Sequence, residues 1–403
     1  MVADDSAPPG IASGRRTPAV LLAVLSGNML LDSIEGSIVL LAVPTIARRF
    51  EVSMSVAQWM LSGFALGFAA MIAAGPAITA RFGVRRVYLT ALAAFVVASV
   101  VGGLADGIEL LIAARVVKGG CVALTAPVGL AVIGAVYPEG SARRRAVSIY
   151  SLFGASGFTV GLLLSGVLTA VNWQWTLLAP APVALLLLFA GRSVLPAVAV
   201  PARPRISASL LGQGMLLRSA VAAAALNGTF IGTLLLTSMQ LRSSHGWSAP
   251  VIALALLPAS LPLVLSVPFT GRMLGRFGTA KPIAVGAVLA LLGALGYFLS
   301  RYPMPYWTVL LPVLTALAAG LVLSFAALNA QSTIGVDAES RAAGALVYQL
   351  WVQGGAAVSL IAIGHSIGES GESRTSAPVV VAAAVVFAAA AWAPGKRKVT
   401  VIS

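Results

Sequence analysis

The strongest constraint on the fold is a stretch of about 20 apolar residues that recurs along the whole chain, because a helix of that length crosses the hydrocarbon core of a bilayer. Hydrophobic residues make up 59% of the 403 residues and only 9% are charged. The mean hydropathy is +0.97. These values exclude a water-soluble globular domain. We therefore predict an all-α membrane protein.

The apolar stretches predict twelve transmembrane helices. Their approximate bounds are 18–43, 56–79, 87–105, 108–134, 146–170, 175–191, 219–240, 249–270, 282–300, 306–328, 342–366 and 376–394. An even number of spans leaves both termini on one side of the membrane.

Basic residues are divided unequally between the two sides of these spans. Cytoplasmic loops retain Lys and Arg, so we place both termini in the cytoplasm of a multi-pass plasma-membrane protein. The outer loops then hold only Arg48, Arg49, Arg242, Arg301 and Arg374. The net charge of +14 lies on short loops that flank the membrane. We therefore predict the lipid bilayer as a partner and no nucleic acid.

An internal repeat divides the chain into two similar halves. Residues 81–86 follow the second span and residues 276–281 follow the eighth, both with an Arg-Phe-Gly sequence. Such a repeat predicts two pseudo-symmetric six-helix bundles. The predicted domains are a cytoplasmic tail at 1–17, a first bundle at 18–197, a cytoplasmic linker at 198–218, a second bundle at 219–394 and a cytoplasmic tail at 395–403.

Residues that form disulfides or bind metal ions are scarce in the sequence. The chain has one cysteine, Cys121, and two histidines, His245 and His365. An intramolecular disulfide is impossible, and we predict no metal and no cofactor. The sequence also has no Gly-Lys-Ser/Thr phosphate loop, so ATP is not the expected energy source. We predict that the chain is not an enzyme.

Several short motifs stand at fixed places in the predicted helices. They are Glu35 to Pro44 in the first span, Gly83, Arg85 and Arg86 after the second, Arg115 to Gly119 in the fourth, Gly157, Gly161 and Gly166 in the fifth, and Trp173-Gln174-Trp175 before the sixth. In these motifs the chain resembles the drug:proton antiporter branch of the major facilitator superfamily, here with twelve rather than fourteen helices. The resemblance covers essentially the whole chain. It implies gating roles for the glycines of the fifth span and for the motif after the second.

The chain departs from the family pattern at several positions. Ala80 and Gly275 stand where the family has an acid that helps to latch the two bundles, so we expect gating to depend more on Arg85, Arg86 and helix-end dipoles. Lys118 replaces a glutamine, and Asp32 is an additional acid. Leu162 replaces the proline that separates exporters from importers in the family, which leaves the direction of transport open.

Two acids lie inside the first span, Asp32 and Glu35, and two bases lie inside the fourth, Arg115 and Lys118. An ionised carboxylate is costly in hydrocarbon, so intramembrane acids face the protein interior or a cavity and find partners. Residues at i and i+3 share a helical face, so both acids can point at one wall. At about 1.5 Å per residue, Glu35 falls at the depth of Arg115, and Asp32 at the depth of Lys118. We predict a neutral set near the membrane midplane.

These four residues are the candidate proton-coupling site. Burial favours a protonated carboxyl and an adjacent cation favours an ionised one, so protonation responds to what is nearby. We predict that Glu35 or Asp32 takes up a proton from outside and releases it to the cytoplasm in exchange for a competing substrate. Replacing Glu35 with Gln is then expected to abolish pH-driven transport and to leave folding intact. The alternative is a static ion-pair network that only fixes helix register.

Uncharged polar and aromatic residues in the later spans are the candidate substrate contacts. They are Asn227, Asn329, Gln349, Trp351 and Gln353. Gln349 and Gln353 share a helical face, where they can bond either a ligand or one another. The spans of the second bundle carry no charge, so we expect this bundle to form an apolar substrate wall.

The sequence favours a monomeric, proton-coupled secondary transporter that exports amphipathic or hydrophobic small molecules by alternating access. Two alternatives remain. One is a proton-coupled importer of a small solute, and the other is a non-transporting membrane receptor on a carrier fold.

Overall fold

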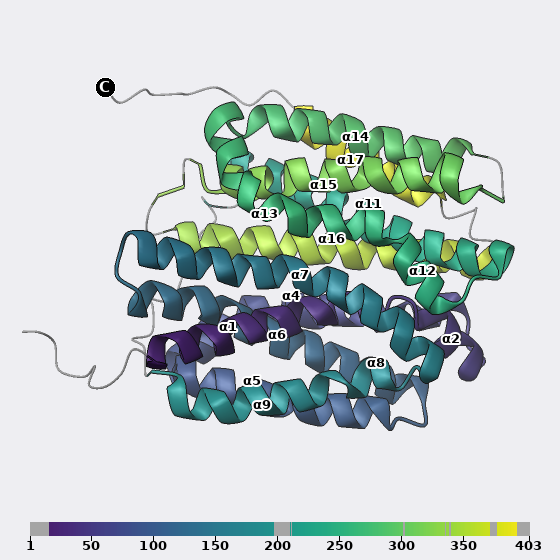
Figure 1. Cartoon of the computed structure of the whole chain (residues 1–403). Coiled ribbons are helices and arrows are strands. Elements are labelled where there is room, and N and C mark those ends of the chain that lie inside the picture. Colours follow the sequence, from purple (N-terminus) through teal and green to yellow (C-terminus); the bar gives the residue numbers. More distant parts are fainter. Residues whose placement is uncertain are drawn as a thin grey trace, which may run out of the picture.

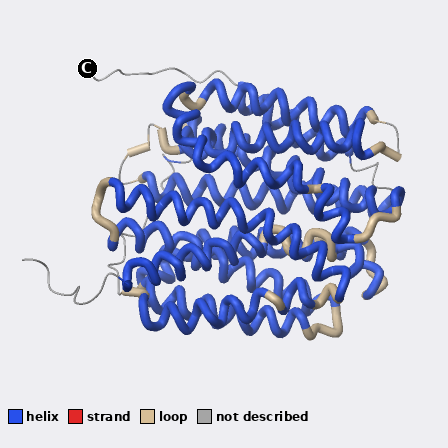
Figure 2. The backbone as a smooth tube through the Cα atoms, in the orientation of Figure 1, coloured by secondary structure: helices blue, strands red, loops and turns tan. Residues whose placement is uncertain are grey.

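The computed structural model describes residues 16–196, 210, 212–300, 303–334, 336–337, 340–370 and 377–392. Within these residues every regular element is a helix, and none is a β-strand (Figure 2). The predicted tails 1–17 and 395–403 and the linker 198–218 lie wholly or largely outside the described residues. The domain boundaries therefore stay predictions.

The helices of the N-terminal half are α1 (Arg16–Glu35), α2 (Val43–Arg49), α3 (Met54–Ala57), α4 (Trp59–Phe82), α5 (Val84–Gly103), α6 (Ile108–Val136), α7 (Ser141–Val171), α8 (Trp175–Leu178) and α9 (Pro180–Val194). Those of the C-terminal half are α11 (Gly214–His245), α12 (Ala249–Ala255), α13 (Leu257–Phe277), α14 (Ala280–Leu299), the π-helical turn η1 (Tyr306–Leu310), α15 (Leu311–Ser332), α16 (Arg341–Ser370) and α17 (Ala377–Trp392). The two halves occupy opposite sides of the molecule (Figure 1).

Among the described residues, 11 helices are long and apolar enough to cross a membrane. This confirms the prediction of an all-α, multi-pass membrane fold. The twelfth predicted span, 376–394, corresponds to α17, which has 16 residues and an apolar core at Pro378–Ala390. α17 is therefore apolar but shorter than each of the eleven helices that are long enough to cross a membrane.

Several predicted spans are interrupted where a proline follows, as two examples show. The prediction of a single helix over 18–43 is wrong, because α1 ends at Glu35 and a series of turns leads to α2. Pro44 has no N–H to continue the helical ladder, and Gly36 is a poor helix former. The predicted span 249–270 is likewise divided into α12 and α13, with Pro258 in the first turn of α13.

Close backbone contact joins α4 to α6. A Cβ atom built on Gly119 of α6 would clash with the carbonyl oxygen of Phe64, and one on Gly67 of α4 would clash with the carbonyl oxygen of Val116. In lipid there is little hydrophobic drive between helices, so small residues that allow such an approach stabilise the pair. The contact places the polar residues of α6 against α4.

The two halves meet through α16, which packs against α3 and α4, and through α7, which packs against α12 and α13. α2 and α12 lie at the same end of the molecule (Figure 1). A Cβ on Gly364 would meet Gln58, and the Ser62 hydroxyl donates to the carbonyl oxygen of Ala357 at 3.5 Å. We call this the closed end. In the predicted topology it is the outer end.

The α4–α6 contact predicts a sharp difference between two glycines of one helix. Gly119→Ala forces a methyl group against the α4 backbone, so we expect it to lower the free energy of unfolding by about 1–3 kcal/mol. Gly134→Ala is the matched control, because no atom lies within 4 Å of its Cβ position. That control gains helix propensity of up to ~1 kcal/mol. Thermal unfolding in detergent measures both, and equal midpoints would contradict the close approach.

Candidate functional site

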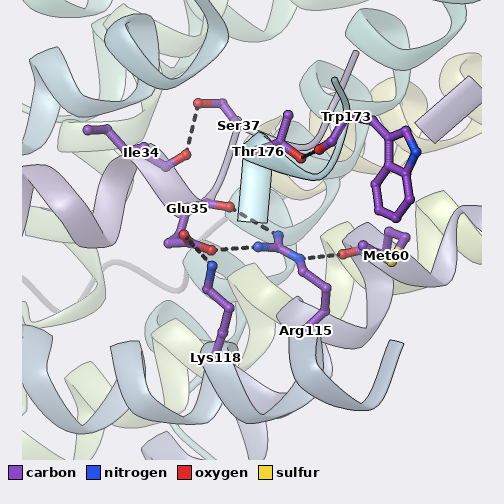
Figure 3. A network of polar contacts seen from close by, with 8 residues as sticks. All are labelled: Ile34, Glu35, Ser37, Met60, Arg115, Lys118, Trp173 and Thr176. Atoms are coloured by element: carbon purple, nitrogen blue, oxygen red, sulfur yellow. Dashed lines mark hydrogen bonds and ion pairs between the residues drawn. The ribbon is translucent and has the colours of Figure 1, made fainter. Parts of the chain in front are cut away.

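Glu35 is the centre of a buried network of charged side chains (Figure 3). Its Oε2 atom lies 2.6 Å from Nη1 of Arg115, and its Oε1 atom lies 2.7 Å from Nζ of Lys118. All three side chains are at most 1% exposed. An ionised group with so little water needs charged partners, and Glu35 has one at each oxygen.

Arg115 joins three helices at this point. Its Nε donates to the carbonyl oxygen of Met60 on α4 at 2.9 Å, and its Nη2 donates to the carbonyl oxygen of Glu35 at 3.1 Å. Glu35 is the last residue of α1, where backbone carbonyls have no helical partner. The guanidinium also lies 4.6 Å from the ring centre of Phe64. Arg115 thus pairs with the Glu35 side chain and caps the end of α1.

Lys118 has a more limited set of neighbours. Its ammonium contacts the Glu35 carboxylate and lies over the ring of Phe95, 4.6 Å from the ring centre. A cation over an aromatic face is stabilised by the ring quadrupole, most strongly where water is excluded. Lys118 therefore stays in the network as a second cation on Glu35.

Asp32 lies in a different setting from Glu35. It accepts a hydrogen bond from Nδ2 of Asn28 at 2.8 Å, and its oxygens lie 3.1 and 3.2 Å from Oγ1 of Thr125. It is 8% exposed and lines a cavity between the two halves of the chain. Both polar partners are neutral, so no cation among the described residues pairs with this carboxyl directly.

The predicted pairing of Asp32 with Lys118 is therefore wrong, whereas that of Glu35 with Arg115 is confirmed. The Cα–Cβ bonds of a helix tilt towards its N-terminus. Since α1 and α6 run in opposite directions, the Asp32 and Lys118 side chains lean away from each other. Lys118 reaches back to Glu35, and Asp32 meets Thr125 on a later turn of α6. The depth of a residue along the helix axis does not include the tilt of its side chain, so depth alone predicts the wrong partner for Asp32 and Lys118.

The central cavity has a volume of about 400 Å³. The N-terminal half contributes Asp32 and Arg115 to its lining, and the C-terminal half contributes Asn227, Gln349 and Gln353 among apolar side chains. The described lining residues of the C-terminal half carry no charge, as expected from the sequence. These five residues from α1, α6, α11 and α16 therefore share one space.

The amides on the C-terminal wall differ in their partners. Nδ2 of Asn227 donates to the carbonyl oxygen of Val352 at 3.2 Å, which links α11 to α16. Gln349 and Gln353 form no hydrogen bond with any residue that the structure describes, nor with each other. Their amide groups are available to a molecule in the cavity.

Two predicted substrate contacts lie elsewhere. Trp351 is 43% exposed and lines an apolar groove between α11, α16 and α17, on the other face of α16. Asn329 is exposed near the end of α15 and does not line the cavity. Residue type predicts a polar or aromatic contact at these positions, but it does not indicate which face of each helix is buried.

The motif between α4 and α5 lies within the N-terminal half. Gly83 has a φ of +82°, a conformation that favours glycine, at the junction of the two helices. Nη2 of Arg85 donates to the carbonyl oxygen of Arg192 at 2.6 Å, near the end of α9, and Arg86 is exposed. Neither arginine bonds to the described part of the C-terminal half. Their gating role stays a prediction.

The three glycines of α7 with predicted gating roles have distinct neighbours. A Cβ on Gly157 would meet Ser33 and the Leu30 carbonyl, and one on Gly161 would meet Ser37 and the Ile34 carbonyl. These two let α7 cross α1 next to the acids. A Cβ on Gly166 would meet Ala253 and the Ala249 carbonyl of α12 in the C-terminal half. α7 therefore contacts the charge network on one side and the other half of the chain on the other.

Sequence reasoning missed Asn28 and Thr125, the two partners of Asp32. Asn28 stands four residues before Asp32, and Thr125 stands seven residues after Lys118. At these spacings Asn28 shares a helical face with Asp32, and Thr125 shares one with Lys118. Polar residues at these spacings from an intramembrane charge were the available signal.

Comparison with known proteins gives a consistent family. The model of the Major Facilitator Superfamily matches residues 25–360. The puromycin resistance protein of Streptomyces alboniger is 34% identical over 172 residues, which are 42% of this chain and 34% of that protein. The cephamycin export protein of Amycolatopsis lactamdurans is 30% identical over 237 residues, 59% of this chain and 46% of that protein. The chain thus spans about one third to one half of these relatives.

A solved structure of similar fold is the nucleoside transporter NupG. It is 14% identical, has a TM-score of 0.73, and the match covers 92% of this chain and 98% of that one. At this identity the likeness shows the fold alone. The family model nevertheless covers most of the chain, and the relatives agree with the resemblance found in the motifs. The chain belongs to the Major Facilitator Superfamily, whose members are membrane transporters and not enzymes.

Proposed function

We propose that the chain exports amphipathic or hydrophobic small molecules in exchange for protons, by exposing its central cavity alternately to the two sides of the membrane. The names of two relatives support this class of substrate, since one confers puromycin resistance and the other exports cephamycin. Each is an organic molecule with polar and apolar parts, which suits a cavity with amides on an apolar wall.

The observation that carries the proposal is the setting of Asp32. It is the carboxyl that lines the cavity, and its hydrogen-bond partners, Asn28 and Thr125, are neutral. A cavity-facing carboxyl without a direct counterion can bind or release a proton as water or substrate enters. We assign proton exchange to Asp32.

Glu35 has a different role in this proposal. It is fully buried and each of its oxygens has a cation within 2.7 Å. In this proposal Glu35 stays paired with both cations and holds Arg115 at the edge of the cavity, while Asp32 exchanges the proton. The sequence alone leaves open which of the two acids exchanges the proton.

Flux measurements in proteoliposomes test the function. Puromycin movement would be followed with a proton gradient imposed in either direction, together with the pH change caused by adding puromycin. Export predicts that puromycin moves against the proton flow. Movement with the proton flow would instead support the importer, and the absence of both fluxes with several amphipathic compounds would support the receptor.

Asp32→Asn is expected to abolish gradient-driven transport, because the amide cannot take up the proton. The fold should remain, since an amide can replace the carboxyl beside Asn28 and Thr125. Glu109→Gln is the matched control, because Glu109 is an exposed acid in the first turn of α6. The measurement is substrate-induced proton movement together with the thermal unfolding midpoint. Proton coupling that survives in Asp32→Asn would refute the assignment.

Glu35→Gln is expected to destabilise the fold, contrary to the expectation from sequence. It leaves Arg115 and Lys118 buried without their shared carboxylate, and breaking a buried pair costs about 3–5 kcal/mol. The double variant Glu35→Gln/Lys118→Gln removes one of the two unpaired cations, so it should be more stable than Glu35→Gln alone. Thermal unfolding of the single and double variants measures this coupling. A double variant less stable than Glu35→Gln would contradict the charge argument.

A further inference from the structure

A second charged crevice lies at the closed end, away from the central cavity. It has a volume of about 470 Å³ and lies between α2, the segment that follows α2, and the last turns of α11. Its lining includes Arg48 and Glu51 from the N-terminal half and Arg242 from the C-terminal half. The crevice therefore crosses the boundary between the two halves, where they must separate if this end opens.

The crevice carries an excess of positive charge. The guanidinium groups of Arg48 and Arg242 are close enough to interact as like charges. Neither forms an ion pair with any residue that the structure describes. Glu51 is the carboxyl in the lining, so two cations face one anion. Its backbone has a φ of +53°, an uncommon value for a residue other than glycine.

The place of these arginines is unusual for a membrane protein. In the predicted topology the closed end is the outer end, where Lys and Arg are few. Arg48 and Arg242 are two of only five basic residues predicted in the outer loops, and they come from different halves of the chain. Like charges across a closed boundary favour separation of the halves, unless an anion lies between them.

We propose that this crevice binds an anionic phosphate group between Arg48 and Arg242, and that the bound anion keeps the outer end closed. Guanidinium groups bind phosphate oxygens through charge-assisted, often bidentate hydrogen bonds. Met239 and Val52 in the lining add apolar contact for the chain of an attached lipid. The phosphate group is either that of an anionic phospholipid or a soluble phosphate ion. Binding is independent of the proposed transport, whereas the effect on closure rests on it.

Binding is tested directly on the purified chain. Native mass spectrometry would count the phosphatidylglycerol and phosphatidylcholine molecules retained by the wild type and by Arg242→Gln. Arg49→Gln is the matched control, because Arg49 directly follows Arg48 in the sequence but does not line the crevice. Its guanidinium lies over the ring of Phe50, and the residue lines a different pocket. We expect loss of retained phosphatidylglycerol in Arg242→Gln and none in Arg49→Gln. Titration with inorganic phosphate identifies a soluble ion as the ligand, if it binds the wild type and not Arg242→Gln.

Closure is tested with a cysteine at the outer boundary. Ser62→Cys, in a Cys121→Ser background, places a thiol beside Ala357 where the closed halves exclude water. A membrane-impermeant maleimide added from outside then labels it only when this end opens. We expect phosphatidylglycerol to slow labelling by about two- to fivefold relative to phosphatidylcholine, the size of one exposed charge pair. Arg242→Gln should be slow in both lipids, because neutralising one arginine removes the same repulsion.

The outcomes separate this proposal from the proposed function. Equal retention of phosphatidylglycerol and equal phosphate binding in the wild type and in Arg242→Gln would overturn the site, as would an equal loss in Arg49→Gln. Retention that depends on Arg242, with equal labelling rates of Ser62→Cys in the two lipids, would support the site and overturn its effect on closure. No labelling under any condition would instead contradict the alternating access of the proposed function.

Discussion

The structure depends on the cost of placing the Glu35 carboxylate where water is absent. Arg115 and Lys118 offset that cost from one face of α6, and Arg115 also bonds to the carbonyl of Met60 on α4. Because apolar surfaces gain little by associating in lipid, polar contacts and close backbone packing decide which helices meet. The position of α1 relative to α4 and α6 therefore follows from one carboxylate and its two cations.

The same interaction explains why α1 can end inside the membrane. Unpaired carbonyls at a helix end are costly in hydrocarbon, and Arg115 bonds to the one at Glu35. The turns that follow are held by α7, since the Ser37 hydroxyl donates to the Phe158 carbonyl at 2.7 Å and the Leu41 amide donates to Oγ of Ser165 at 3.1 Å. The interruption is thus bonded on both sides, by α6 and by α7.

The sequence alone predicts the features that follow from length and spacing. Apolar stretches of membrane length gave the helical spans, and acids and bases at i, i+3 spacing gave the contact between α1 and α6. The direction of side chains and the rotation of each helix about its axis could not be predicted from the sequence. Asp32 and Lys118 lean in opposite directions along antiparallel helices, and Trp351 lies on the face of α16 opposite to Gln353. Side-chain direction and helix rotation depend on how neighbouring helices pack, and this packing cannot be derived from residue spacing alone.

Charge balance links Asp32 to whatever occupies the cavity. With Asp32 ionised, the set of two acids and two bases is neutral. With Asp32 protonated, it carries a net positive charge. The C-terminal half contributes no charged side chain to the cavity lining that the structure describes.

Exchange of a proton at Asp32 therefore changes the charge that faces the cavity, so in the proposed cycle proton uptake and cavity occupancy affect each other. A contiguous set of contacts leads from there to the other half of the chain: Asp32 lies one turn before the end of α1, the turns after α1 bond to α7, and Gly166 of α7 packs against α12. In the proposed cycle, a shift of α1 on protonation would act on the boundary that Arg48 and Arg242 line.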